Sequence, residues 1–208
     1  MRFFLLGINL FLVVISSLMA LTVGAVEPAE RNIIYIHAPA AICSLVCFCV
    51  LFAGSVQYLR TKNQKWSFIA AASGEVGFVF ATVLNITGMI FAYIEWGTLW
   101  TLSPRLVSSA ALWFLLAAYL ILRVSFTNQR RKEQISAVFG IVAFIDVPLV
   151  VISARLVRDI HRPSLSFGTL GQILAFLLAI FATGFLAALL IWIRSDILKI
   201  KNEMDMRF

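Results

Sequence analysis

Six long apolar runs dominate this sequence and leave little room for any fold outside a lipid bilayer. A helix needs about 20 mainly apolar residues to cross a membrane, and each run reaches that length with few charges inside it. The segments between the runs are short, which leaves no space for a soluble domain. We therefore predict an all-α integral membrane protein, with residues 1–208 forming a single six-helix domain. The expected spans are Phe3–Val26, Ala38–Leu59, Trp66–Ile94, Pro104–Val124, Ile135–Ala154 and Leu170–Ile193.

The composition supports the membrane class. Hydrophobic residues make up 62% of the 208 positions and charged residues 13%, whereas a soluble domain is about half apolar and about a quarter charged. Three cysteines, Cys43, Cys47 and Cys49, fall within one apolar run. No cysteine lies in a loop to pair with them, and a zinc site needs more ligands. We interpret them as small residues in a membrane helix.

Positive charge is concentrated in alternate connections, which sets the expected orientation. Cytoplasmic loops are enriched in Lys and Arg, so we place both termini in the cytoplasm. The +7 net charge is then a topology signal and not a nucleic-acid-binding surface. Twelve basic residues fall on the predicted inner side: Arg2, Arg60, Lys62, Lys65, Arg123, Arg130, Arg131, Lys132, Arg194, Lys199, Lys201 and Arg207. Five fall on the predicted outer side: Arg31, Arg105, Arg155, Arg158 and Arg162.

The first apolar run also has features of a secretory signal, with a basic residue before it and Ala25 near its end. Its length of more than 20 residues exceeds the apolar core of a signal peptide. We expect a retained membrane helix.

Both histidines of the chain fall on the predicted outer side. His37 precedes Pro39, and proline suits the first turn of a helix, so we expect His37 just outside the second span. His161 lies in the last outer loop. A single histidine at a membrane boundary is often only a polar cap, but two on one side, facing the same compartment, favour a shared ligand-binding role.

A tryptophan-containing segment, Glu95 to Arg105, lies on the same side. Trp96 and Trp100 are four residues apart, which suits one face of a helical turn, so we expect both indoles to face one pocket on the outer membrane surface. The alternative is an aromatic belt that only anchors helices at the headgroups. Ser103 followed by Pro104 is typical of an N-cap and first turn, and predicts the start of the fourth helix.

The outer basic residues are all arginines. A guanidinium group binds carboxylates through two parallel hydrogen bonds, which makes Arg105 and Arg158 candidate partners for an acidic ligand. Alternatively, lipid phosphates or outer acidic residues neutralise the arginines. Those acidic residues are Glu27, Glu30, Glu95 and Asp159.

Two imidazoles, flat aromatic surface and guanidinium groups on one face match the needs of haem. The iron takes axial nitrogen ligands, the macrocycle packs against aromatic rings and the two propionates require cations. The predicted outer face therefore offers the kinds of group that haem requires, and a haem site is one interpretation of it.

The same residues resemble the CcmC family of haem-handling proteins in cytochrome c maturation. Tyr35-Ile36-His37-Ala38-Pro39-Ala40-Ala41 is similar to that family's first histidine segment, and His161 falls where its second outer histidine lies. The run from Trp96 to Ser108 is similar to its tryptophan-rich loop, which typically reads WGTWWVWDxRLTS. The similarity continues through Phe144-Ile145-Asp146-Val147-Pro148 and Arg194-Ser195-Asp196-Ile197-Leu198, so it covers nearly the whole chain.

The resemblance implies a six-helix haem-transfer factor, rather than a classical enzyme, in the bacterial inner membrane. Its cargo would be haem b, held on the outer side between His37 and His161 as axial ligands, with Trp96 and Trp100 as the loop contacts of the macrocycle. A membrane-anchored haem chaperone would receive the haem, with help from ATP-binding-cassette transporter subunits. This chain departs from the family loop at Leu99, Leu102 and Ser103, which removes aromatic stacking and one carboxylate.

Asp146 stands where relatives often have Asn, and an ionisable group inside a span is a functional candidate. We prefer the interpretation that Asp146 bonds a neighbouring helix or Arg155.

A rival class is a small-solute transporter or channel subunit, with Glu75 and Asp146 along its path. Helix packing explains the nearby Gly74, Gly77 and Gly88 equally well. A membrane cytochrome is a third class, but it usually places histidine pairs within its helices.

Overall fold

The computed structural model describes residues 1–23, 32–156 and 167–205, and within those ranges the chain forms helices and no strands. The helices are α1 (Arg2–Thr22), α2 (Ile34–Thr61), α3 (Gln64–Trp96), α4 (Pro104–Ser125), α5 (Gln129–Ala143), α6 (Asp146–Leu156) and α7 (Leu170–Asp205). Among the described residues, six stretches are long and apolar enough to cross a membrane, because α5 and α6 jointly supply one of them, Gln129–Ile152. The prediction of an all-α, multi-pass membrane protein with six spans is confirmed.

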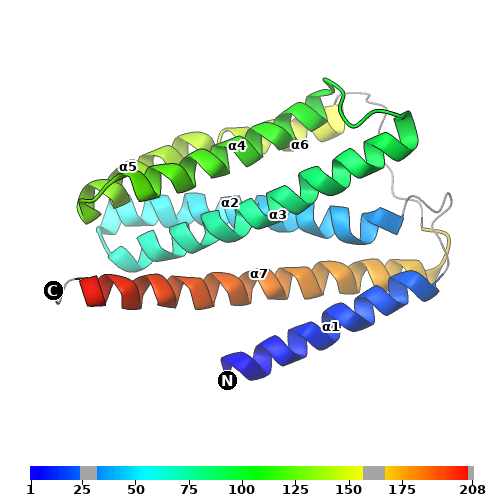
Figure 1. Ribbon diagram of the computed structural model, residues 1–208, viewed down its shortest axis with the longest axis horizontal. Coiled ribbons are helices and arrows are strands. Elements are labelled where there is room, and N and C mark those ends of the chain that lie inside the picture. The colour runs from blue at the N-terminus through cyan, green and yellow to red at the C-terminus, as the bar shows by residue number, and fades with distance from the viewer. Residues whose placement is uncertain (24–31, 157–166, 206–208) are drawn as a thin grey trace.

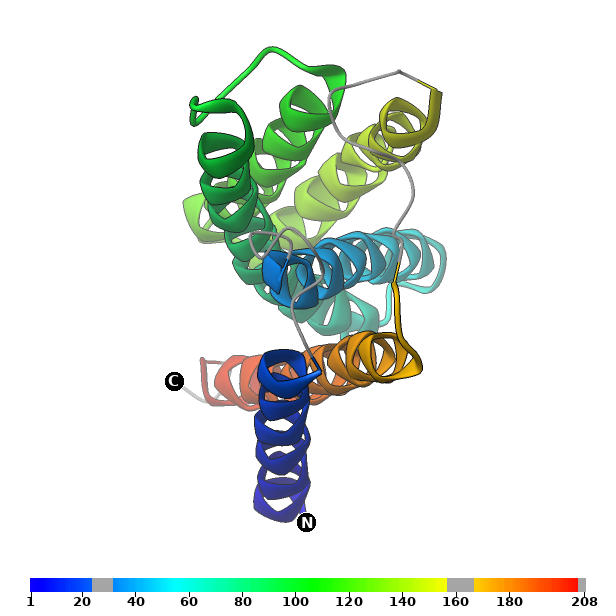
Figure 2. The same ribbon diagram turned by 90° about the vertical axis from the view of Figure 1, so that its right-hand side faces the viewer.

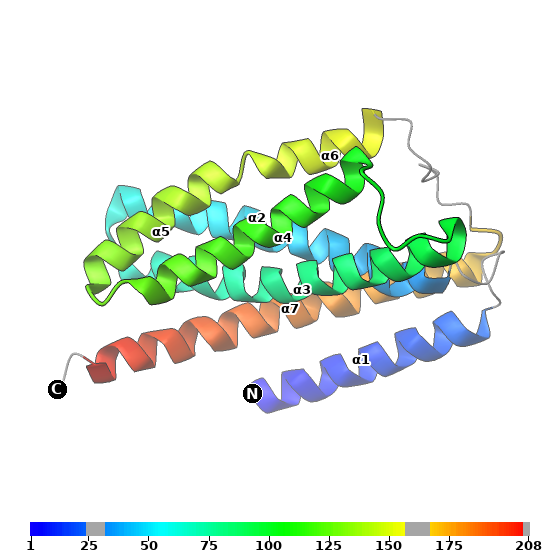
Figure 3. The ribbon, with the colours of Figure 1, turned by 45° about the horizontal axis from the view of Figure 1, so that its top comes forward.

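Helices α2 and α3 form an antiparallel pair in the middle of the bundle (Figure 1). On one side of this pair lie α4, α5 and α6, and on the other lie α7 and then α1, as the view along the bundle shows (Figure 2). The α2–α3 and α4–α5 turns and the last turns of α7 share one end of the bundle (Figure 3). We call it the basic end, because Lys62 and Lys65 lie in the first of these turns. The opposite end carries His37 and is called the histidine end.

Side-chain caps explain the tight turns at the basic end. Asn63 accepts a hydrogen bond at Oδ1 from the backbone N–H of Lys65, at 3.0 Å, and so starts α3. Asn128 starts α5 in the same way by accepting from Arg131 at 3.0 Å. Each cap satisfies one of the backbone donors that the first turn of a helix leaves without a partner.

The fifth span is not one continuous helix, which corrects the prediction of Ile135–Ala154. It breaks between α5 and α6 at Phe144 and Ile145. Pro148 accounts for the break, because a proline has no N–H to give to the carbonyl four residues earlier and its ring collides with that carbonyl. Here that carbonyl belongs to Phe144, and it accepts instead from the N–H of Val147 at 3.0 Å.

Small residues allow the central helices to pack closely. A Cβ atom added at Gly77 in α3 would lie 3.0 Å from the Cβ of Cys47 in α2, and one added at Gly74 would lie 2.7 Å from the ring of Tyr119 in α4. Cys47 is fully buried. Close backbone approach through small residues is how membrane helices associate, so packing accounts for these glycines and for this cysteine, as predicted.

The outward faces of the helices are apolar, as lipid contact requires. Large hydrophobic side chains are exposed on every span, and they include Phe3, Leu10, Val46, Val79, Phe114, Ile121, Val138, Leu177 and Phe181. In water such a surface would be an aggregation site. Helix α7 has 36 residues, about 54 Å at 1.5 Å per residue, which exceeds the roughly 30 Å hydrocarbon thickness of a bilayer.

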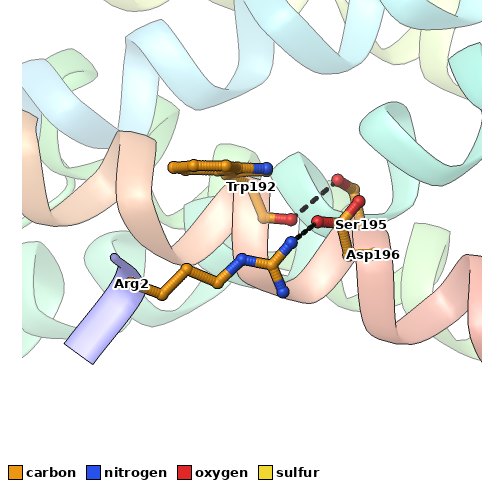
Figure 4. Close-up of polar contacts among 4 residues, drawn as sticks. All are labelled: Arg2, Trp192, Ser195 and Asp196. Atoms are coloured by element: carbon orange, nitrogen blue, oxygen red, sulfur yellow. Dashed lines mark hydrogen bonds and ion pairs between the residues drawn. The ribbon is translucent and has the colours of Figure 1, made fainter. Parts of the chain in front are cut away.

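Helix α1 is joined to α7 by polar contacts as well as by packing. The buried side chain of Asn9 donates to the carbonyl of Ala182 at 2.8 Å. Near the basic end Arg2 forms an ion pair with Asp196, and its guanidinium carbon lies 5.2 Å from the centre of the Trp192 ring (Figure 4). These contacts hold the first half of α1 against α7.

Candidate binding site at the histidine end

His37 lies inside α2, which corrects the prediction that it precedes the helix. Helix α2 begins at Ile34, so His37 is in its first turn and Pro39 follows it within the helix. Pro39 was expected in the first turn, but it is the sixth residue of α2, where it has no N–H to give to the carbonyl of Tyr35 four residues earlier. The consequence is that the helical backbone fixes the direction of the imidazole.

The half-buried imidazole of His37 contacts α3. Its Nδ1 atom lies 2.9 Å from the hydroxyl oxygen of Thr87. The next residue is Gly88, and a Cβ atom at that position would lie 3.3 Å from Cε1 of the ring. The Nδ1–Cε1 edge of His37 therefore rests against the backbone of α3.

Trp96 is the last residue of α3. Gly97 follows it with a left-handed backbone (φ +69°), and its N–H donates to the carbonyl of Tyr93 at 2.9 Å. Only glycine adopts this conformation without strain, so Gly97 ends the helix. The indole of Trp96 meets the ring of Phe91 edge-on, with centroids 6.0 Å apart.

Trp100 lies in the non-helical segment 97–103, and its side chain is 37% exposed. The hydroxyl of Thr98 donates to the carbonyl of Trp100 at 3.0 Å and shapes this segment. The prediction that Trp96 and Trp100 occupy one face of a helical turn is wrong, because Gly97 ends the helix between them. A pocket shared by the two indoles stays a prediction.

The start of α4 matches the sequence pattern. Ser103 accepts at Oγ from the N–H of Leu106 at 3.3 Å, and Pro104 occupies the first helical position. The N-cap prediction is confirmed. Arg105 follows in the first turn and is half-buried. Leu99 and Leu102 are 51% and 85% exposed, so the segment that holds Trp100 also presents two apolar side chains.

Hydrogen bonds tie α3 to α4 below this loop. Ser109 and Asn85 are joined by two contacts of 3.4 Å, and the indole N–H of Trp113 donates to Thr82 at 2.8 Å. Because these bonds cross between the two helices, they fix the spacing of the loop's two ends. Trp96 and Arg105 are therefore carried by a braced helix pair.

His161 and Arg158, the remaining candidate site residues, lie outside the described residues, and so do Arg31, Asp159 and Arg162. The side chains of Glu95 and Arg155 are likewise outside them. Helix α6 ends and α7 begins at the histidine end (Figure 1). The pairing of His161 with His37, and of Arg158 with a propionate, remain predictions.

Glu75 and Asp146, the two acidic residues considered for a solute path, differ in their contacts. Glu75 receives two hydrogen bonds from Arg194, at 2.5 and 3.1 Å, and so joins α3 to α7. Asp146 begins α6, and in the part of the chain that the structure describes its buried Oδ2 has no hydrogen-bond partner. A bond from Asp146 to Arg155 stays a prediction. Within the described ranges no cluster of three or more metal-binding side chains occurs.

A hollow of about 850 Å³ lies at the other end of the bundle, between α2, α3 and α7. Its lining includes Gln64, Lys65, Trp192 and Lys199, which places it at the basic end. It is therefore separate from His37 and from the segment 97–103.

Sequence reasoning missed Thr87, and it assigned Gly88 to helix packing without its contact to His37. The run Asn85-Ile86-Thr87-Gly88 interrupts the apolar third span with two polar residues and a glycine, and polar groups within a span usually have a partner on another helix. That signal marked the positions. The identity of the partner depended on how α2 and α3 pair in space.

Comparison with known proteins gives one family. Residues 1–207 match the CcmC family, described as heme exporter protein C. The chain is 27% identical over 161 residues to heme exporter protein C of Escherichia coli K12, covering 72% of this chain and 66% of that protein. It is 28% identical over 140 residues to a ccmC-like mitochondrial protein of cytochrome c biosynthesis from Marchantia polymorpha, covering 66% and 59% of the two chains. The chain thus spans about three fifths to two thirds of the length of these relatives.

Proposed function

The chain belongs to the CcmC family, and from this premise we propose that it binds one haem at the histidine end and hands it on for cytochrome c maturation. Curated relatives are named heme exporter protein C. The proposed activity is haem binding and transfer rather than classical enzymatic catalysis.

The observation that carries the proposal is the position of three kinds of side chain. His37 near the start of α2, Trp96 at the end of α3 and Arg105 at the start of α4 all lie at one end of the bundle. An imidazole, an indole and a guanidinium are the groups that suit an iron, a macrocycle and a propionate. This donor set fits haem.

We assign His37 and His161 as the axial ligands, Trp96 and Trp100 as contacts of the macrocycle, and Arg105 and Arg158 as partners of the propionates. Nitrogens bound on opposite sides of one iron stand about 4 Å apart, since each metal–nitrogen bond is about 2 Å. The loop that holds His161 would therefore have to bring its imidazole close to the first turn of α2.

The cargo would be haem b, held on the outer face of the bacterial inner membrane. The receiver would be a membrane-anchored haem chaperone, assisted by ATP-binding-cassette transporter subunits. Exposed Leu99 and Leu102 provide apolar contact for such a receiver beside Trp100. Stacking from this loop would be weaker than in relatives with a fuller set of tryptophans.

The test is the absorption spectrum of the protein purified in detergent with added haem. Wild type should bind about one haem per chain with the low-spin spectrum of bis-imidazole iron. The single variants His37→Ala and His161→Ala should lose that spectrum, while membrane insertion and thermal unfolding stay unchanged. If the double variant binds haem with the wild-type spectrum, the ligands are elsewhere and the proposal fails.

The transporter alternative is less well supported. A solute path along Glu75 requires a carboxylate that can bind the solute. The carboxylate of Glu75 instead accepts two hydrogen bonds from the guanidinium group of Arg194. Stoichiometric haem binding that depends on the histidines would separate the two functions, because a solute path through the bundle does not require either imidazole.

A further inference from the structure

The hydroxyl of Thr87 lies between a backbone carbonyl and the ring of His37. Its Oγ1 is 2.7 Å from the carbonyl oxygen of Val83 and 2.9 Å from Nδ1 of His37. A carbonyl oxygen only accepts hydrogen bonds, so two oxygens 2.7 Å apart must share the hydroxyl proton. The proton of Thr87 is therefore directed to Val83, and Oγ1 faces His37 as an acceptor. It follows that Nδ1 of His37 carries a hydrogen.

A second threonine of α3 also lies between a backbone carbonyl and a ring nitrogen, and in this case the ring nitrogen can only be a donor. Thr82 donates to the carbonyl of Phe78 at 2.8 Å and lies 2.8 Å from Nε1 of Trp113. An indole nitrogen can only donate. In α3, then, a threonine hydroxyl that donates to the carbonyl four residues earlier accepts from a ring N–H on a neighbouring helix, which is the arrangement assigned to Thr87.

We infer that Thr87 is a positioning residue that holds His37 in the Nδ1–H tautomer and reserves Nε2 for the haem iron. A neutral imidazole carries one hydrogen, so Nε2 then has the lone pair that binds a metal. A hydrogen bond from the other ring nitrogen fixes the orientation of a ligand histidine and raises its basicity. The inference rests on the proposed function, in which His37 binds haem.

Gly88 completes this support. A Cβ atom there would lie 3.3 Å from Cε1 and 3.9 Å from Nδ1 of His37. Any larger residue would push the Nδ1–Cε1 edge away from α3 and lengthen the bond to Thr87. The two adjacent residues of α3 thus hold one ring edge, by a hydrogen bond at Thr87 and by close contact at Gly88.

The tautomer can be measured without haem. The chain has two histidines, so His161→Ala leaves a single ¹⁵N-labelled imidazole, that of His37, for NMR. At alkaline pH, where imidazole is neutral, we expect a protonated Nδ1 and an unprotonated Nε2. Thr87→Val, which keeps the shape but removes the acceptor, should give a mixture of tautomers, and Thr87→Ser should restore the wild-type pattern. A predominantly Nε2-protonated ring in the His161→Ala protein would overturn the inference, as would an unchanged pattern in Thr87→Val.

Haem affinity gives the second measurement, made in the chain with both histidines. Loss of a hydrogen-bond partner of a ligand histidine typically weakens metal binding about 10- to 100-fold, so we expect that loss in Thr87→Val and its recovery in Thr87→Ser. Thr61→Val is the matched control, since at the basic end it removes a threonine hydroxyl that likewise donates to a helical carbonyl and accepts from an N–H, and it should bind haem as wild type does. Equal affinities in Thr87→Val and wild type overturn the positioning role. Failure of wild type to bind haem overturns the proposed function instead, and the NMR result still tests the tautomer.

Discussion

At the scale of single residues, three polar side chains in the second half of α3 each make two kinds of bond. Thr82, Asn85 and Thr87 all donate to a carbonyl four residues earlier in the same helix. Each also contacts a residue on another helix: Trp113, Ser109 and His37, respectively. Because a span has no water to satisfy polar groups, the first bond fixes the hydroxyl or amide and so gives the second one a defined direction.

Gly88→Ala should weaken haem binding about fivefold. The added Cβ would press on Cε1 of His37 at 3.3 Å, and overpacking of this kind costs about 1 kcal/mol. Titration of purified protein with haem measures the effect. Gly184→Ala is the control, because a Cβ at Gly184 in α7 meets nothing within 4 Å among the described residues. Identical affinities for the two variants would show that close contact at Gly88 is unimportant.

Leu99→Trp should strengthen haem binding by about 2- to 10-fold. Leu99 is half exposed beside Trp100, and a further aromatic contact is worth about 0.5–1.5 kcal/mol. The dissociation rate of haem, followed by transfer to an excess of a haem-binding protein, measures the change. Ile121→Trp, on the lipid-facing side of α4, adds the same ring away from the site and should leave that rate unaltered. A rate that is the same in Leu99→Trp and wild type contradicts a role for position 99 in holding the macrocycle.

At the scale of elements, the segment 97–103 is defined by how two helices end and begin. Gly97 ends α3 with a left-handed residue, and Ser103 caps α4. The cross-helix bonds of Asn85 and Thr82 then set the distance that this segment must bridge. Both ends of this segment are therefore fixed by the helices that flank it. This restricts the conformation of the loop and the position of Trp100.

Ser103→Ala should destabilise the protein by about 1 kcal/mol, the usual cost of losing an N-cap. Ser103→Asp should restore stability, because a carboxylate accepts the same bond from Leu106 and interacts favourably with the start of the helix. Thermal unfolding in detergent measures both. The control is Ser125→Ala, whose hydroxyl bonds only the carbonyl of Ile121 within α4. If the Ser103→Ala and Ser125→Ala proteins unfold at the same temperature, the N-cap of α4 does not contribute to the stability of the protein.

Local sequence signals were sufficient for some elements and not for others. The cap at Ser103 and the number and order of the spans follow from residue type and hydropathy, and both were predicted. The early start of α2 and the break before Asp146 depend on where a proline is tolerated, which neighbouring structure decides. The contact between His37 and Thr87 joins residues 50 positions apart, so no local pattern contains it.

At the scale of the whole molecule, the candidate site is assembled from the ends of three helices that lie at one end of the bundle. The imidazole of His37 comes from α2, its support from α3 and the half-buried Arg105 from α4. The other end is held by ion pairs that join α7 to α1 and α3, through Arg2 with Asp196 and Arg194 with Glu75. The antiparallel α2–α3 pair connects these two ends.

The histidine end should face outward and both termini should face the cytoplasm. The α2–α3 and α4–α5 turns lie at one end of the bundle (Figure 3), and twelve of the seventeen Lys and Arg residues fall on that side of the sequence, which is the side retained in the cytoplasm. Reporter fusions after Lys65, Lys132 and the last residue should all give cytoplasmic signals, whereas a fusion within the 97–103 loop should give an external one. A fusion after Lys132 that reports the outer side would mean that the number of spans before it is wrong. External signals from all three basic-side fusions would keep the six spans but invert the bundle, and the haem site would then open to the cytoplasm.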